Sequence, residues 1–219
     1  MNAFRVMKLP DCFTLLNIIL GFYAILLASG ANFQAAVVLI ILAAAADGLD
    51  GFLARKAGSS PLGDHLDSLA DLVSFGAAPA FLALTAFPLP LAASLAGAFY
   101  LACGALRLAR FNVSARSDKF FEGLPIPAAG IALSASVLLG KPELPPALML
   151  LLGLLMVSSI SYPKIRDLRI LAIVGLASIL AALLIWLQGD IQGGSLLLTM
   201  IILIYLASPV MISCLRKGK

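Results

Sequence analysis

The stretch DGLDGFLARKAGSSPLGDHLDSLAD, residues 47–71, carries five of the chain's 11 acidic residues. It lies in a chain of 219 residues that is 62% hydrophobic and only 12% charged. An ionised carboxylate in or beside hydrocarbon costs several kcal/mol unless it is paired or bound to a metal. The stretch therefore predicts a functional site, and the apolar sequence around it predicts the fold.

The composition excludes an ordinary soluble globule, in which about a quarter of the residues are charged. The mean hydropathy is +1.06, so we expect an all-α integral membrane bundle that forms a single domain over residues 1–219. A spanning helix needs about 20 apolar residues. Eight stretches meet this need: 12–29, 33–54, 64–86, 91–110, 124–140, 145–162, 169–187 and 195–213.

The basic residues predict the orientation of these spans. With eight spans, all of the 15 Lys and Arg residues except Lys141 fall on one side. Cytoplasmic loops carry the excess of positive charge, so both termini and the acidic stretch are expected on the cytoplasmic side of the cell membrane. Because these cations are spread over turns beside apolar spans, they favour anionic lipid headgroups over nucleic acid as partners.

Two pairs of aspartates in the acidic stretch are spaced to share a helix face: Asp47 with Asp50, and Asp67 with Asp71. Ser60, directly before a proline, is the expected N-cap of the second helix. The turn Gly58-Ser-Ser-Pro61 joins the helix of Asp47 and Asp50 to the helix of Asp67 and Asp71, and it is so short that the two helices should form an antiparallel hairpin. Both pairs of carboxylates would then lie at the same depth and face one cavity.

Carboxylates that close repel one another unless a cation neutralises them. Oxygen-only ligands favour Mg²⁺ or Mn²⁺ over zinc, and these ions typically serve phosphate chemistry. Arg55 can hold a phosphate through paired hydrogen bonds, while Gly51, Ala54 and Gly63 leave room for a bulky group. The residues therefore predict a nucleotide diphosphate beside two divalent ions. Asn17, polar within the first span, either bonds across helices or reaches the nucleotide.

The motif also resembles the signature of a known family. Its pattern, Asp-x-x-Asp-Gly-x-x-Ala-Arg followed by Gly-x-x-x-Asp-x-x-x-Asp, is similar to that of the CDP-alcohol phosphotransferases at eight positions: Asp47, Asp50, Gly51, Ala54, Arg55, Gly63, Asp67 and Asp71. The resemblance implies a six-helix catalytic core, here at about 10–166. The last two spans carry no charge in their interiors, so we expect residues 167–219 to form two additional packing helices. It also implies a homodimer and two divalent metals held by the four motif aspartates.

The same resemblance implies a reaction and roles for single residues. A lipid phosphate is transferred from a CDP-linked lipid to an alcohol, and CMP is released. Asp71 would be the general base, because an alcohol attacks phosphorus poorly until a base takes its proton. Arg55 would bind the diphosphate, and Gly51 and Gly63 would border the cytidine.

A second stretch narrows the acceptor. It reads Arg107-Leu-Ala-Arg110-Phe-Asn112, then Phe-Glu-Gly-Leu-Pro-Ile-Pro at 121–127, with Tyr-Pro-Lys at 162–164. These residues resemble the phosphatidylserine synthase branch, which implies L-serine as acceptor and CDP-diacylglycerol or CDP-archaeol as donor. A guanidinium binds a carboxylate through two parallel bonds, so Arg107, Arg110 and Asn112 are candidates for the serine pocket. Alternatively, both arginines anchor the helix end at lipid headgroups.

Rival interpretations remain at this stage. A glycerol 3-phosphate or inositol phosphate acceptor would need further cations, which Arg116, Lys119 and Lys164 supply. Intramembrane prenyltransferases also use acidic motifs with Mg²⁺, but theirs lie far apart in sequence. A cation transporter would carry its carboxylates near the middle of its spans. The sequence leaves the roles of Asp64 and His65 open.

Overall fold

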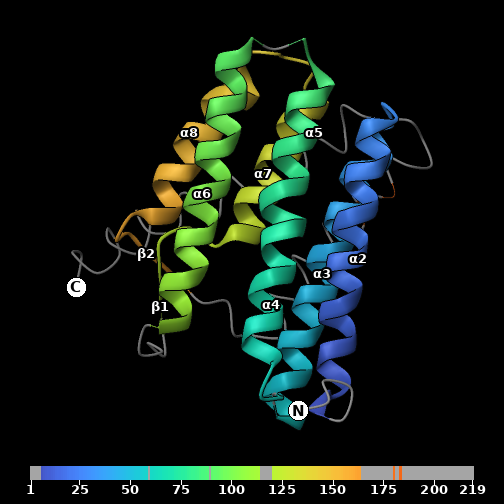
Figure 1. Cartoon of the computed structure of the whole chain (residues 1–219), viewed down its shortest axis with the longest axis vertical. Coiled ribbons are helices and arrows are strands. Elements are labelled where there is room, and N and C mark those ends of the chain that lie inside the picture. The colour runs from blue at the N-terminus through green and yellow to red at the C-terminus, as the bar shows by residue number, and fades with distance from the viewer. Residues whose placement is uncertain are drawn as a thin grey trace.

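The computed structural model describes residues 6–58, 60–88, 90–113 and 120–163, together with Leu180 and Leu183. Its helices are α2 (Leu9–Ser29), α3 (Phe33–Ala57), α4 (Gly63–Asp71), η1 (Leu72–Ala77), α5 (Ala78–Ala86), α6 (Leu91–Val113), α7 (Ile126–Leu138) and α8 (Leu144–Val157). They form one bundle (Figure 1). Apart from Leu180 and Leu183, the expected spans at 169–187 and 195–213 lie outside these residues.

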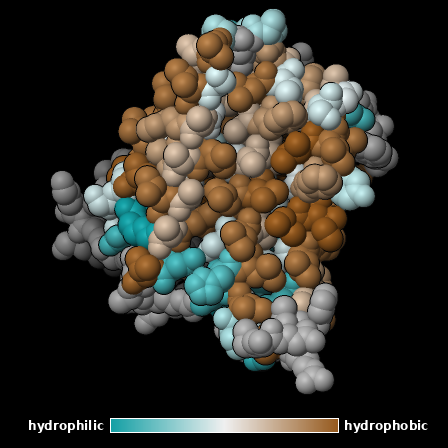
Figure 2. All heavy atoms as spheres, in the orientation of Figure 1, coloured by the Kyte–Doolittle hydropathy of each residue, from teal (hydrophilic) through white to brown (hydrophobic). Residues whose placement is uncertain are grey.

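Four of the helices in this part of the chain are long and apolar enough to cross a membrane: Leu9–Ser29, Phe33–Lys56, Gly63–Ala86 and Leu91–Val113. The third consists of α4, η1 and α5 in direct succession. Hydrophobic residues cover the middle of the face in Figure 2, and hydrophilic ones gather below, toward the end where α4 begins in Figure 1. The prediction of an all-α membrane bundle is confirmed.

The fifth and sixth helices are shorter than predicted. The stretches 124–140 and 145–162 contain α7 with 13 residues and α8 with 14. Pro125 precedes α7, and Gly140 leaves the helical region at φ +68° just after it. Beyond α8 the chain turns extended at Ser158 and enters strand β2 (Ser161–Pro163), which pairs antiparallel with β1 (Phe120–Glu122). Hydropathy alone does not reveal these breaks.

Small residues allow α2 and α3 to pack closely. Ala24 and Ala28 of α2 are buried, as are Ala36 and Ala43 of α3. Such residues are typical of helix contacts in lipid, where close backbone approach replaces the hydrophobic drive. Large apolar side chains of α2 are exposed instead on its other face: Leu16, Ile19, Phe22, Tyr23 and Leu26. This face is suited to contact with lipid.

The turn between α3 and α4 differs in detail from the prediction. Helix α3 ends at Ala57, three residues beyond the predicted stretch 33–54, and Gly58 follows at φ +80°. Ser60 is not the N-cap, because α4 begins only at Gly63 with Leu62 in the cap position. The Ser60 hydroxyl instead donates to Asp11 Oδ1 of α2 over 3.0 Å. A buried carboxylate on a neighbouring helix thus binds the hydroxyl that local sequence assigns to a cap.

Candidate active site

Three aspartates converge where α3 and α4 meet. One carboxylate oxygen from each of Asp47, Asp67 and Asp71 lies within 4.8 Å of the other two. Asp47 comes from the last turns of α3, while Asp67 and Asp71 lie four residues apart on one face of α4. The hairpin therefore brings three of the four predicted metal ligands together.

Asp50, the fourth predicted ligand, has a different environment. It is one turn from Asp47 on α3, and it is close enough to Asp47 and Asp67 to interact with both electrostatically. Its Oδ2 accepts a hydrogen bond of 2.7 Å from Thr14 Oγ1 of α2. Asp50 is thus buried at the side of the cluster nearest α2.

A polar stripe on α2, formed by Asp11, Thr14 and Asn17, runs along the hairpin. The three residues recur every third position, so they share a helix face, and all three are buried. Asp11 accepts from Ser60, Thr14 donates to Asp50, and Asn17 Nδ2 donates to Asp71 Oδ1 over 3.3 Å. Helix α2 therefore orients carboxylates on both helices of the hairpin.

The cluster fits a divalent metal ion. Its donors are carboxylate oxygens only, which Mg²⁺ and Mn²⁺ prefer. In addition, no described residue donates a hydrogen bond to Asn17 Oδ1, although this oxygen is fully buried beside Asp71. An oriented acceptor without a donor is expected where an absent group, such as a metal-bound water or a substrate, completes the site. Asp47, Asp67 and Asp71 would hold the ion.

Arg107 of α6 belongs to the same site. It is only 6% exposed, and it interacts electrostatically with Asp47 and Asp71. Its guanidinium carbon lies 5.6 Å from the centre of the Phe111 ring, one turn further along α6. A buried guanidinium needs anionic partners, and the aspartates provide them. Of the three acceptor candidates, Arg107 is the one at the acidic cluster.

The other two acceptor candidates have partners elsewhere. Arg110 donates to four main-chain oxygens, one from β1 and three from the end of α8: Glu122, Met156, Val157 and Ser158. Asn112 and Ser68 of α4 form a hydrogen-bonded pair, with Asn112 Nδ2 donating over 3.0 Å. These contacts tie the end of α6 to α8 on one side and to α4 on the other.

The predicted nucleotide-binding residues lie along the end of α3 and the start of α4. Arg55 is exposed, and its Nη1 is 3.5 Å from the position that a Cβ on Gly51 would occupy. Ala54 is half-buried on the same helix, and Gly63 opens α4. Asp64 and His65 are both exposed on the first turn of α4.

Sequence reasoning missed the supporting side chains. Asp11, Thr14, Ser60 and Ser68 were given no role at the site, yet each contacts a predicted site residue or connects its helix to another. The repeat of polar residues at every third position of an apolar span could have revealed Asp11 and Thr14. Ser60 and Ser68 carry no comparable signal, because serine is common in turns and on helix surfaces.

Fold and site together define a polytopic membrane protein with an acidic, oxygen-only cluster at one end of its helices. Residues 7–212 match the family model described as CDP-alcohol phosphatidyltransferase. The chain belongs to this family, and the resemblance inferred from the motif is confirmed.

Three relatives place the chain more closely. It is 42% identical over 163 residues to an archaetidylserine synthase of Methanothermobacter thermautotrophicus, covering 72% of this chain and 70% of the relative. It is 45% identical to a CDP-diacylglycerol–serine O-phosphatidyltransferase of Methanocaldococcus jannaschii, covering 73% and 76%. A Bacillus subtilis protein with the latter name is 37% identical, covering 72% and 91%.

Proposed function

We propose that this chain transfers a phosphatidyl-type group from a CDP-linked lipid to the hydroxyl of L-serine, releasing CMP. The observation that carries the proposal is the convergence of Asp47, Asp67 and Asp71 at the end of apolar helices. The three relatives are named for the synthesis of serine phospholipids, which favours serine over glycerol 3-phosphate or inositol phosphate. The product is phosphatidylserine or archaetidylserine, according to the donor lipid.

The reaction needs a base beside the attacking alcohol. The serine oxygen forms a bond to the phosphorus that carries the lipid, and the bond from that phosphorus to the CMP oxygen breaks. The serine hydroxyl proton passes to Asp71, whose carboxylate is buried and oriented by Asn17. The electron pair of the broken bond leaves with CMP.

Binding of the CDP-lipid is assigned to the end of α3 and its surroundings. We propose that Arg55 pairs with the diphosphate, that Gly51, Ala54 and Gly63 accommodate the nucleotide, and that Asn17 contributes its unused Oδ1. Asp47, Asp50, Asp67 and Asp71 would hold two divalent cations, Mg²⁺ or Mn²⁺. When bound, such ions stabilise the charge that develops on the phosphate oxygens.

For the acceptor we propose that Arg107 is the partner of the serine carboxylate. It interacts electrostatically with Asp47 and Asp71, so a serine bound there would have its hydroxyl close to Asp71. Arg110 and Asn112 would shape the pocket by fixing the end of α6, since their hydrogen bonds reach α8 and α4. Substitution of Arg107 should therefore weaken serine binding directly, whereas substitution of Arg110 should act by loosening the end of α6.

Three features of the whole protein complete the proposal: its domain organisation, its orientation in the membrane and its oligomeric state. We infer a single membrane domain over residues 1–219 whose catalytic core spans about 10–166. The site and both termini face the cytoplasm, as the distribution of Lys and Arg favours. The functional unit is a homodimer, by analogy with the family.

A direct assay tests the reaction. Purified protein is incubated with Mn²⁺ and CDP-diacylglycerol or CDP-archaeol, separately with L-serine, glycerol 3-phosphate or inositol 1-phosphate, and released CMP is measured. We expect turnover with serine only, and none after the divalent ions are removed with EDTA. Turnover confined to glycerol 3-phosphate would contradict the serine assignment, and full activity after exhaustive chelation would contradict the metal site.

A further inference from the structure

The helix that carries Asp67 and Asp71 contains a π turn directly after Asp71. Helix α4 ends at Asp71, η1 covers Leu72–Ala77, and α5 continues from Ala78 without a break. A π turn takes one residue more than an α turn, and such turns are rare and frequently lie at functional sites. One extra residue changes the phase of everything beyond it by roughly 100° around the helix axis. The turn therefore sets how the two aspartates face relative to the membrane-embedded half of the helix.

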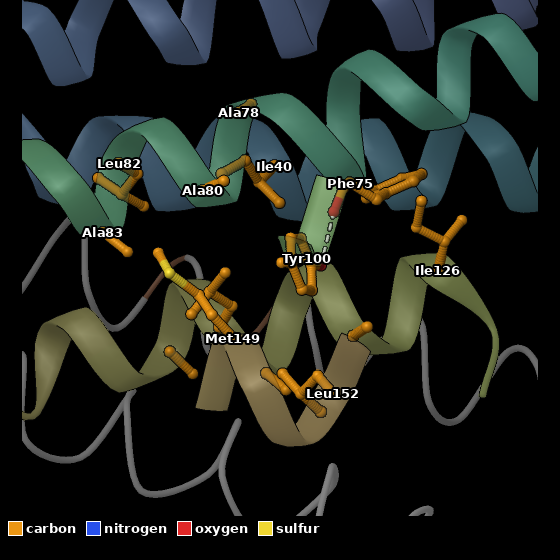
Figure 3. Close-up of a cluster of buried hydrophobic side chains, with 14 of the residues drawn as sticks. Ile40, Phe75, Ala78, Ala80, Leu82, Ala83, Tyr100, Ile126, Met149 and Leu152 are labelled. Atoms are coloured by element: carbon orange, nitrogen blue, oxygen red, sulfur yellow. Dashed lines mark hydrogen bonds between the residues drawn. The ribbon is translucent and has the colours of Figure 1, made fainter. Parts of the chain in front are cut away.

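Two side-chain hydroxyls hold the π turn in place. One comes from a neighbouring helix and the other from the turn itself. Tyr100 of α6 donates from Oη to the carbonyl oxygen of Phe75 over 2.8 Å (Figure 3). Ser74 within the turn donates from Oγ to the carbonyl oxygen of Asn17 over 2.8 Å. Tyr100 and Ser74 are both fully buried. The bond from Tyr100 thus satisfies a carbonyl at the point where the regular helical ladder is interrupted.

Two glycines on other helices allow the neighbours to approach this turn closely. A Cβ on Gly21 of α2 would lie 2.7 Å from Ser74 Cα, and a Cβ on Gly130 of α7 would lie 2.9 Å from Phe75 Cα. Neither distance is compatible with a side chain. The turn is therefore enclosed by α2, α6 and α7, and the packing leaves it little freedom to shift.

The enclosed turn is connected to the acidic cluster through Asn17. The side-chain amide of Asn17 donates to Asp71 Oδ1, and the main-chain carbonyl oxygen of Asn17 accepts from Ser74 in the turn. A change in the turn would thus move the Asp71 carboxylate and the amide that orients it together. Asp67, on the same face of α4, would rotate with Asp71 and away from Asp47.

We infer that Tyr100 is a positioning residue for the transfer reaction: by holding the π turn, it keeps Asp67 and Asp71 aligned with Asp47 for metal binding and for proton removal from the acceptor. Tyr100 does not touch the cluster itself, and it acts through the Phe75 carbonyl and the turn. The part of this inference that concerns catalysis rests on the proposed function. The part that concerns metal binding rests on the geometry of the aspartate cluster.

The test is Tyr100→Phe, which removes one oxygen and keeps the buried ring. Substituting groups that orient metal ligands typically costs about 10–100-fold in metal affinity or activity. We therefore expect kcat for CMP release to fall about tenfold or more, with KM for the CDP-lipid largely kept, and Mn²⁺ affinity in electron paramagnetic resonance titrations to weaken. Ser136→Ala is the control, because it removes a buried hydroxyl that donates only within α7; it should leave both quantities unchanged.

A second variant keeps the inference testable if Tyr100→Phe does not fold. Ser74→Ala removes the other hydrogen bond of the turn, and we expect losses in kcat and Mn²⁺ affinity in the same direction. Folded Tyr100→Phe or Ser74→Ala protein with wild-type kcat and Mn²⁺ affinity would overturn the inference. Failure of the proposed function has a different signature: the wild-type protein would release no CMP with serine, while the comparison of Mn²⁺ affinities would still decide the role of Tyr100.

Discussion

Asp50 and Asp71 belong to one motif but have different partners. Asp50 accepts a short bond from the Thr14 hydroxyl, whereas Asp71 accepts a longer one from the Asn17 amide and lies against two other carboxylates. Carboxylates this close to one another favour a bound cation between them. Asp71 belongs to this three-carboxylate cluster and is oriented by the Asn17 amide, so we propose Asp71, rather than Asp50, as the base.

Asp71→Asn should therefore abolish transfer and leave CDP-lipid binding largely intact. The amide keeps the shape of the side chain but cannot take the serine proton, and loss of a general base costs about 10²–10⁴-fold in rate. The measurements are CMP release and binding of a radiolabelled CDP-lipid. Asp64→Asn, an exposed position on the same helix, is the control and should stay close to wild type. Unchanged turnover in Asp71→Asn would remove the residue from the base role.

For single residues, the spacing of Asp47, Asp67 and Asp71 in the sequence was enough to predict that their carboxylates lie close together. Residues three or four apart on a helix share a face whatever the tertiary structure, and the turn between the helices is short. The contacts of Thr14, Ser60 and Tyr100 could not be predicted, because each depends on which helix lies opposite. The three acceptor candidates were close in sequence, yet their side chains reach three different parts of the molecule.

Among the elements, the two-stranded ladder beside α6 is the one that the hydropathy pattern missed. Gly123 sits between β1 and α7 at φ +77°, and its N–H donates to Ile160 O over 2.8 Å. Arg110 donates to carbonyl oxygens at the end of α8, which have no partner within the helix. A cation at a helix C-terminus also interacts favourably with the helix dipole. Arg110 and Gly123 thus connect the end of α6, the β1–β2 ladder and the end of α8.

Gly123→Ala should destabilise the protein more than Gly140→Ala. Both glycines have a positive φ, which costs an L-residue about 1–2 kcal/mol. A Cβ on Gly123 would in addition collide with the Met156 carbonyl, whereas one on Gly140 meets nothing within 4 Å. The measurement is the free energy of unfolding by detergent titration, with Gly140→Ala as the matched control. Equal losses in the two variants would contradict a tight junction at Gly123.

The ends of these elements mark the limit of prediction from sequence. The bounds of the first four helices were predicted within a few residues, because long apolar runs end at Gly, Pro or charge. Helices α7 and α8 were predicted too long, since the apolar run continues through Leu124 and past Ser158 although the backbone leaves the helix. Hydropathy indicates which side chains are apolar. It does not indicate where the backbone becomes extended and pairs with another strand.

Across the whole molecule, the polar site lies at one end of an apolar bundle. The α3–α4 turn, the start of α2 and the end of α6 meet at this end, and the connection between α7 and α8 lies away from it (Figure 1). Under the proposed function, the lipid would reach this end from the membrane and the water-soluble acceptor from the adjoining aqueous phase. The side was predicted from Lys and Arg alone, so it calls for a direct measurement.

Labelling of single cysteines should place the two ends on opposite faces of the membrane. In a background with Cys12, Cys103 and Cys214 replaced by alanine, we compare His65→Cys, at the start of α4, with Lys141→Cys, between α7 and α8. Both positions are exposed. A membrane-impermeant maleimide should label the cysteine at 65 only in inside-out vesicles and the cysteine at 141 only in right-side-out ones. The reverse pattern would contradict the proposed orientation.

The short connection between α3 and α4 also bears on how the protein is made. Because the clustered aspartates belong to neighbouring helices, they meet as soon as those two helices pair, whereas Arg107 leaves the ribosome only after α5 and most of α6. The two helices of the hairpin can therefore pair before Arg107 has taken its place beside them. We expect an inorganic cation from the surrounding solution to accompany the hairpin, so that biogenesis, and not only turnover, depends on the ionic composition of the cell.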